Sequence, residues 1–224
     1  MLSLRQILAR HPSLLLIDSS SSLIQVGLFL ADRAPTWESL ETDAGSGIFA
    51  ATETLLKRTN AAFISIDAFA FCAGPGSVLG IRTAAVAVRT WNVIRERPVF
   101  SFSGLELVAH AQKINRMGRN FSVIADARRA TWHRVMVNTD GAMQPLHRVS
   151  ATELAGDLMM PTTFRHWTPL PPGIERVPYF VDQMLAELGE TSLFSENSDP
   201  DAFLHEAPDY LTWTPRIHRA PTSP

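Results

Sequence analysis

A short apolar run that ends in an aspartate occurs twice in this chain, half its length apart. Residues 14–18 (LLLID) precede four serines and a second apolar run, and residues 122–126 (SVIAD) precede a polar turn and another such run. An apolar run, a polar turn and a second apolar run predict a β-hairpin. A single aspartate at a turn is common, but Asp18 and Asp126 stand in matching places. The repeat therefore predicts two lobes that begin in the same way.

Helical and strand-like segments alternate after the first hairpin, which predicts an α/β architecture. Helices are expected over residues 47–60 and 78–96, with a strand over 66–73 between them and a third helix beginning at Ser103. The last third predicts helices over 152–160 and 181–188, a loop over 168–173 and a strand over 208–213. The expected divisions are a frayed surface extension (1–12), a first lobe (13–107), a second lobe (108–215) and a flexible tail (216–224).

The segment 78–96 is apolar on two faces of its helix. One face carries Ile81, Ala84, Ala85, Val88 and Trp91, and the other carries Leu79, Val86 and Val93. Such a helix is usually buried on both sides. Two interpretations stay open: a sheet and a helix of the same chain cover the two faces, or a sheet covers one and a partner protein the other.

The composition excludes several classes of protein. Twenty Lys and Arg stand against twenty-two Asp and Glu, so the bulk charge predicts no attraction to nucleic acid or to an anionic membrane. The single cysteine, Cys72, lies in an apolar run and predicts a buried thiol without a disulfide. No two histidines lie three or four residues apart, so no helical pair can hold a metal. No apolar run approaches the roughly 20 residues of a membrane helix, and we expect a soluble, cytoplasmic protein.

Two loops carry the candidate binding residues. A glycine-rich turn between a strand and a helix can present backbone amides to an anion, and a serine run after an aspartate can hold phosphate. Each loop is also explained as a tight turn bonded to its own hydroxyl groups, with Ser77 as the N-cap of the helix that follows, and both interpretations stay open. The candidate nucleotide or loop-site residues are Asp18, Ser20, Gly74, Gly76, Ser77, Gly80 and Arg82.

Four segments resemble, in order, segments of the TsaB (YeaZ) family: LLLIDSSSSLIQVGLFL, FAFCAGPGSVLGIRTAAVAVRTW, SFSGLELVAHA and VIADARRATWHRVMV. The closing PDYLTWTP resembles the end of that family. The most specific motif is G-P-G-S-x-x-G-[LI]-R, which begins here at Gly74. The resemblance covers about residues 14–137. The chain differs in having residues 44–48 (AGSGI) where the family has His-Ser-Glu, and about a dozen extra residues at its start.

The resemblance implies an actin-like ATPase fold (ASKHA, ribonuclease H-like) and a catalytically inert subunit in bacterial tRNA threonylcarbamoyladenosine synthesis. It implies a heterodimer with a TsaD-like paralogue, which transfers the threonylcarbamoyl group to an adenosine beside the anticodon. A TsaE-like ATPase joins the assembly, TsaC-type enzymes supply the threonylcarbamoyl-adenylate, and tRNA is met only through the complex. No cofactor is required. Whether ATP or ADP binds weakly at a subunit interface, and whether the chain forms a homodimer when alone, stay open.

The resemblance also places the subunit contact on the first-lobe helices, here 47–60 and 78–96. The expected interface residues are Ile48, Thr52, Leu55, Ala84, Ala85, Ala87, Val88 and Trp91.

The alternative is an active actin-like phosphotransferase, such as a small-molecule kinase. That activity needs glycine-rich second phosphate and adenosine loops, because backbone approaches a phosphate closely at glycine. The chain contains no Gly-Gly, and Ala127-Arg128-Arg129 follows Asp126. A glycoprotease has even less support, since the chain lacks a metal-ligand set and a nucleophile motif.

Overall fold

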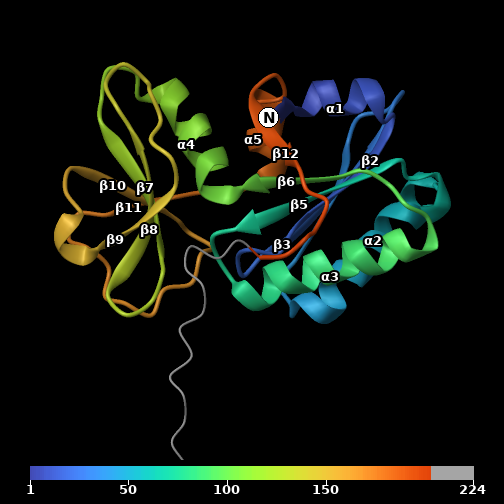
Figure 1. The fold of residues 1–224 in the computed structure, drawn as a ribbon, viewed down its shortest axis with the longest axis horizontal. Helices are drawn as coiled ribbons and strands as arrows, with labels where there is room; N and C mark the ends of the chain where they lie inside the picture. The colour runs from blue at the N-terminus through green and yellow to red at the C-terminus, as the bar shows by residue number, and fades with distance from the viewer. Residues whose placement is uncertain (203–224) are drawn as a thin grey trace, which may run out of the picture.

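The computed structural model describes residues 1–202, which form two lobes (Figure 1). The first lobe contains a seven-stranded sheet with the strands β1 (Leu2–Ser3), β2 (Ser13–Asp18), β3 (Ile24–Leu30), β4 (Thr36–Leu40), β5 (Ala68–Gly74), β6 (Val99–Ser103) and β12 (Ser192–Glu196). The second lobe contains a five-stranded sheet with β7 (Phe121–Asp126), β8 (Thr131–Val137), β9 (His147–Ser150), β10 (Asp157–Pro161) and β11 (Glu175–Val177). The helices are α1 (Leu4–Arg10), α2 (Ala44–Thr59), α3 (Val78–Ile94), α4 (Gly104–Asn115) and α5 (Val181–Glu187), with 3₁₀ turns at Phe63–Ser65 and Ala151–Glu153.

Both sheets are built on the same strand order. The first contains β4-β3-β2-β5-β6 and the second is β9-β8-β7-β10-β11. In each lobe two antiparallel strands follow the central first strand on one side, and two parallel strands lie on the other. Asp18 and Asp126 end the two central strands. The predicted α/β fold of two related lobes is therefore confirmed.

The central strand β2 is buried on both faces and separates two hydrophobic cores. Leu15 and Ile17 face α2 and α3 in the smaller core. Leu14 and Leu16 belong to a larger core that continues through α1, α4 and α5 into the second lobe. Figure 1 shows the same layering, with α2 and α3 on one side of the first sheet and α1 and α5 on the other. A strand buried on both faces consists of a continuous apolar run, which accounts for the LLLI sequence of β2.

The N-terminal segment is part of the first lobe, so the prediction of a frayed extension is wrong. Ser3 caps α1 in a reciprocal pair with Gln6, and β1 pairs with β12. Leu4 and Ile7 are buried in the larger core. Two apolar residues three positions apart are enough to bury one face of a helix of two turns.

The end of the described chain also returns to the first lobe. β12 pairs antiparallel with β6, so residues 192–196 lie in the first sheet, whereas the sequence placed 108–215 in the second lobe. The helix expected over 152–160 is wrong as well, because β10 forms there and pairs with β7 and β11. The strand expected over 208–213 and the tail 216–224 lie outside the described residues.

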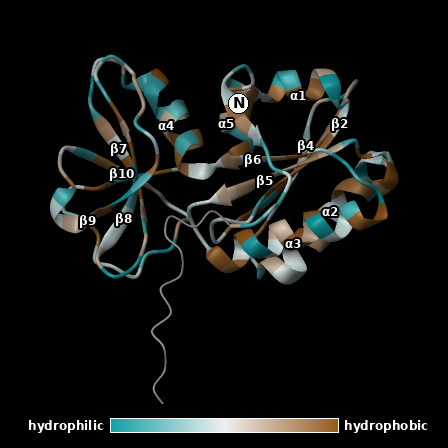
Figure 2. Cartoon of the chain, viewed as in Figure 1, coloured by the Kyte–Doolittle hydropathy of each residue, from teal (hydrophilic) through white to brown (hydrophobic). Residues whose placement is uncertain are grey.

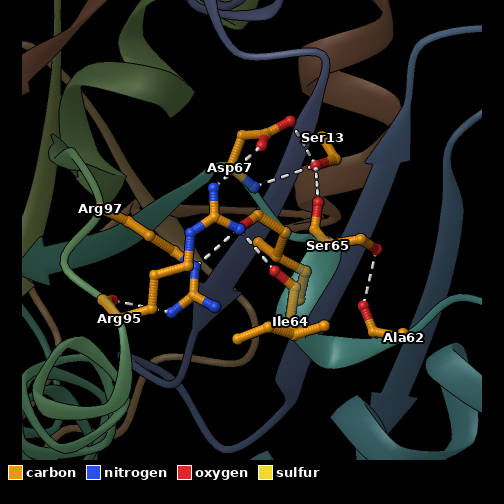
Figure 3. Close-up of polar contacts among 8 residues, drawn as sticks. Ser13, Ala62, Ile64, Ser65, Asp67, Arg95 and Arg97 are labelled. Carbon is orange, nitrogen blue, oxygen red and sulfur yellow. Dashed lines mark hydrogen bonds and ion pairs between the residues drawn. The ribbon is translucent and has the colours of Figure 1, made fainter.

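Polar side chains fix the end of the first sheet at which the inner strands β2, β5 and β6 begin (Figure 3). The Arg95 guanidinium donates to the Ile64 carbonyl at 2.5 Å, and Arg97 Nε donates to the Ile66 carbonyl at 2.7 Å. Ser13 Oγ donates to Asp67 at 2.8 Å. Together these bonds hold the Phe63–Ser65 turn against the starts of β2 and β6.

No helix among residues 1–202 is both long enough and apolar enough to cross a membrane.

We predict that Ile7→Ala lowers the free energy of unfolding by about 2–5 kcal/mol, because it leaves a cavity in the larger core. Arg10→Ala on the exposed side of α1 should change it by less than about 0.5 kcal/mol. Chemical denaturation measures both values. Equal, small effects would mean that α1 contributes nothing to the core.

Candidate functional site

The serine loop after β2 and the glycine loop after β5 pack directly on each other. The Ser77 amide donates to the Ser20 carbonyl at 2.7 Å, and Ser19 Oγ donates to the Gly80 carbonyl at 2.8 Å. A Cβ on Gly76 would overlap the Ser20 carbonyl oxygen, and a Cβ on Gly80 would overlap that of Ser19. The glycines therefore permit close contact between two loops of the chain itself. At least one amide that an anion site would use is already bonded to protein.

Ser77 also caps α3, as the sequence suggested, since its hydroxyl accepts from the Gly80 amide at 3.3 Å. Arg82 does not join this loop site. It is exposed on α3, and its Nε lies 3.9 Å from Asp201. The structure thus brings together Asp18, Ser20 and the four residues Gly74, Gly76, Ser77 and Gly80, and leaves Arg82 outside.

Asp18 is fully buried and saturated with hydrogen bonds. It accepts from the Ser20 amide at 2.8 Å, from Ser20 Oγ at 2.7 Å and from the Tyr179 hydroxyl. Burial raises the pKa of Asp18, and these hydrogen bonds only partly oppose that rise. Cys72 is buried beside it, and burial followed by the charge of Asp18 raises the pKa of this thiol. The carboxyl group thus has no open side toward a ligand in this arrangement.

Tyr179 brings the returning chain to Asp18. It lies between β11 and α5, and Gln25 on β3 bonds the backbone on either side of the next residue: Gln25 Nε2 donates to the Tyr179 carbonyl at 3.3 Å, and the Val181 amide donates to Gln25 Oε1 at 2.9 Å. Phe164 packs edge-on against the Tyr179 ring at 5.1 Å. Sequence analysis missed Tyr179, because nothing in its local pattern points to a partner 161 residues away.

Asp126, the equivalent aspartate in the second lobe, has a different set of partners. It accepts from the amides of Arg128 at 2.5 Å, Trp167 at 2.5 Å and Thr168 at 2.6 Å, and from Thr168 Oγ1 at 3.2 Å. Burial acts to raise the pKa of Asp126, but these hydrogen bonds outweigh it and the pKa is lowered. Asp126 therefore joins the turn after β7 to the loop after β10.

The cleft between the two aspartates is closed by the protein. The Ser22 amide donates across it to the Thr163 carbonyl at 3.0 Å. What remains is a hollow of about 10 Å³, close to the minimum for one water molecule. The hollow is lined by Ser20, Ser21, Gly76, Ser77, Ala125, Asp126, Phe164, Arg165 and Trp167. A nucleotide does not fit in this arrangement.

The eight expected interface residues are all buried inside the first lobe, which corrects that prediction. Between 0% and 9% of each remains exposed, because α2 and α3 pack on each other and on the sheet. They are Ile48, Thr52, Leu55, Ala84, Ala85, Ala87, Val88 and Trp91. None of the three alanines therefore faces outward.

The outer face of α3 carries the exposed apolar residues instead. Leu79, Val86 and Val93, which we call the outer α3 stripe, are 78%, 49% and 87% exposed. Phe49 on α2 is also half exposed and packs edge-on against Trp91 at 5.7 Å. Figure 2 shows hydrophobic residues along both helices. The second apolar face noted in the sequence is therefore left uncovered by the described residues.

Among residues 1–202, no group of three or more His, Cys, Asp or Glu side chains is placed to hold a metal ion.

The fold is that of the actin-like proteins, with two lobes of the same topology. Residues 46–151 match the family model described as TsaD: tRNA N6-adenosine threonylcarbamoyltransferase. The chain is similar to the structure of YeaZ from Pseudomonas aeruginosa, with a TM-score of 0.61 and 20% identity over 79% of this chain and 90% of that one. A second structure, of an uncharacterized protein with similarity to peptidase YEAZ from Pseudomonas aeruginosa, gives 0.59 and 20% over 81% and 97%.

No curated protein matches the sequence. The likeness to the two solved structures confirms, at the level of fold, the resemblance to the TsaB (YeaZ) family that the motifs indicated. The family-model match covers α2, α3 and the first part of the second lobe.

We predict that Gly80→Ala destabilises the protein by about 1–3 kcal/mol through the overlap with Ser19, although alanine is the better helix former by about 1 kcal/mol. Gly45→Ala is the matched control in the first turn of α2, where the nearest atom is a side-chain oxygen of Asp43 at 3.1 Å and no backbone atom overlaps the new Cβ. It should leave stability within about 1 kcal/mol of the parent. Thermal or urea unfolding measures the stability of both variants. A Gly80→Ala protein more stable than the parent would contradict the packing argument.

A second prediction concerns pH. Because the folded pKa of Asp18 is raised, the stability that Asp18 contributes is complete below about pH 4 and declines as the pH rises through the folded pKa. Asp18→Asn keeps an oxygen for Ser20 and can donate to the Tyr179 oxygen. Its stability relative to the parent should therefore increase from pH 4 to pH 7 in urea unfolding. A constant difference across this range would show that folding does not raise the pKa of Asp18.

Proposed function

We propose that this chain is a non-catalytic subunit of the tRNA threonylcarbamoyladenosine modification complex, and that it binds a TsaD-like transferase and holds it in its active form. The match of residues 46–151 to the transferase family and the YeaZ-like fold support this assignment. The observation that carries it is the outer α3 stripe, an uncovered apolar helix face beside a closed cleft. The protein would contribute a surface to the reaction and no chemistry of its own.

The outer α3 stripe has the chemistry of a subunit contact. Leu79, Val86 and Val93 are spaced seven residues apart, so they lie along one side of α3 and can pack against another helix. Large aliphatic side chains in a row are unusual on the surface of a monomer. Arg82 and Arg89 flank the stripe, and each lies 3.9 Å from an aspartate of the segment after β12. This gives the apolar surface a charged rim, as is common in interfaces.

The family-model match points to the kind of partner. It includes most of α2 and all of α3, so a TsaD-like transferase is expected to carry its own versions of these helices. Two such surfaces can pair around a pseudo-twofold axis, and two copies of this chain can pair by the same face when the transferase is absent. A TsaE-like ATPase would join this heterodimer in a cytoplasmic complex. No cofactor is required for the contact itself.

The alternative, an actin-like phosphotransferase, has weaker support. Its phosphate and adenosine sites would lie in the cleft, where a hollow of about 10 Å³ remains. Asp18 and Asp126 are the carboxylates it would use, and both are saturated by protein donors. ATP turnover by the purified chain that is lost in Asp18→Asn would favour this alternative over the proposed function.

We predict that Val86→Glu leaves the protein folded and weakens its complex with a TsaD-like transferase at least about tenfold, because a carboxylate must be desolvated in the contact. Ala85→Glu should instead unfold the lobe, since Ala85 is fully buried. Binding is measured by calorimetry, and circular dichroism checks the fold. The folded variant should also fail to support threonylcarbamoyladenosine formation on tRNA at limiting concentration.

Ile114→Glu provides the matched control, because Ile114 is an exposed apolar residue on α4, away from the stripe. It should bind and support modification as the parent does. If Val86→Glu and Leu79→Glu both do so too, the outer α3 stripe is not the contact. If the parent binds no TsaD-like transferase, the proposed function is wrong and the fold assignment still stands.

A further inference from the structure

The near-neutral net charge conceals an uneven distribution between the lobes. Residues 104–177, which form α4 and the second sheet, contain nine Lys and Arg against six Asp and Glu. The rest of the described chain contains nine against fourteen. The second lobe is therefore basic and the first acidic. A prediction based on net charge alone does not detect a basic surface confined to one lobe.

An exposed tryptophan lies beside arginines in the basic lobe. Trp167, in the loop after β10, is 57% exposed, which is unusual for a large aromatic side chain with no partner protein in contact. The Arg128 guanidinium lies over this ring, 4.3 Å from its centroid. Arg129 and Arg165 are exposed in the same two loops. We call these four residues the tryptophan corner.

The tryptophan corner is held rigidly from beneath by Asp126. Its carboxylate accepts from the amides of Arg128 and Trp167, one from each loop, and the second oxygen also takes the Thr168 amide. These bonds come from the backbone and leave the side chains of Arg128 and Trp167 free to face solvent. A buried carboxylate that fixes two surface loops positions their side chains with little entropy left to lose on binding.

The turn after β7 has a backbone that side chains rarely adopt. Arg128, Arg129 and Ala130 have φ values of 65°, 52° and 56°, in the left-handed region that favours glycine. Such conformations persist where the surrounding structure imposes them, and they cluster at functional sites. Here they place two consecutive arginines at the tip of the hairpin whose Arg128 lies over the Trp167 ring.

We propose that the tryptophan corner binds an unpaired stretch of RNA, with a base stacked against the Trp167 ring and phosphates paired with Arg128, Arg129 and Arg165. Aromatic rings stack on bases that are not already paired, and arginines contact both the phosphates and the base faces. A fully paired duplex offers phosphates but no free base, so this combination selects for single strands. The affinity of one such corner is modest.

The choice of RNA rather than DNA rests on the proposed function. The hollow between the lobes is lined by Arg165 and Trp167 together with Gly76 and Ser77, which directly precede α3. The tryptophan corner thus lies next to the start of the helix that carries the outer α3 stripe. A transferase bound to that stripe would have this corner beside it, where the unpaired loop of its tRNA substrate can reach it.

The test measures binding of a fluorescently labelled RNA hairpin with an unpaired loop, by anisotropy, to the full chain alone and in its complex with a TsaD-like transferase. Trp167→Leu should weaken binding roughly tenfold, within the range found for removal of one stacked aromatic ring. Trp167→Phe, which retains a ring, should restore most of the loss. Arg129→Gln and Arg165→Gln should each reduce the salt dependence by about 0.7 in the log–log slope.

Arg119→Gln is the matched control, because Arg119 is an exposed arginine of the same lobe at the opposite end of β7. It should leave binding nearly unchanged. Side-chain substitutions leave the backbone amides that bond Asp126 in place, so we expect all these variants to fold. Their melting temperatures test this expectation. The inference is overturned if Trp167→Leu binds as the parent does, if a blunt duplex of the same stem binds equally well, or if the parent binds no RNA alone or in the complex.

These experiments distinguish a failure of the RNA-binding proposal from a failure of the proposed function. If the transferase does not bind the chain but RNA binding still depends on Trp167, the RNA-binding corner stands and the proposed function is wrong. If the complex forms and modifies tRNA, and Trp167→Leu binds RNA and supports modification at limiting tRNA as the parent does, only the corner is wrong.

Discussion

The buried carboxyl of Asp18 is the point at which the first hairpin is bonded to the segment that returns from the second lobe. It bonds the serine loop of the first lobe through Ser20 and the returning chain through Tyr179. A carboxyl in this position is costly unless its oxygens are bonded, and here donors occupy both. Because Tyr179 precedes α5 and β12, this contact directs the return of the chain to β6. The same contact extends to the closed cleft, since Phe164 packs on Tyr179 and lines the remaining hollow.

The two repeated aspartates occupy equivalent positions in the two lobes but have different hydrogen-bond partners. Asp18 joins buried segments and has a pKa that burial raises, whereas Asp126 joins two surface loops and has a pKa that its hydrogen bonds lower. Neither is left facing an open cleft. The two surfaces that we propose as binding sites lie outside the cleft, on the outer α3 stripe and at the tryptophan corner. Under the proposed function, a fold shared with phosphotransferases would serve as a scaffold for contacts, in keeping with the rule that fold alone does not determine function.

Local patterns in the sequence were enough to predict those elements whose apolar and polar residues alternate, or are capped, within a few neighbouring positions. The β2–β3 hairpin, the two-faced helix α3 and the cap at Ser77 are of this kind. Short strands such as β10 and β12 were missed, because five residues carry little periodicity and their pairing partners are remote in sequence. The two faces of α3 were identified correctly, but alanine and valine do not reveal which of them the sheet covers. Tyr179 and Trp167 acquire their roles only through contacts with aspartates 161 and 41 residues away.

The return of the chain to its first lobe has a consequence during synthesis. Strand β6 leaves the ribosome about ninety residues before its neighbour β12, a delay of roughly 5–20 s at ordinary translation rates. Over that time the growing chain presents an unpaired strand edge, the kind of surface on which nascent proteins associate wrongly. The second lobe is translated within this interval, while the first sheet still lacks β12. The first lobe becomes complete only when nearly all of the described chain has emerged, so a truncated product that ends after β11 would retain the exposed edge and be cleared or aggregate.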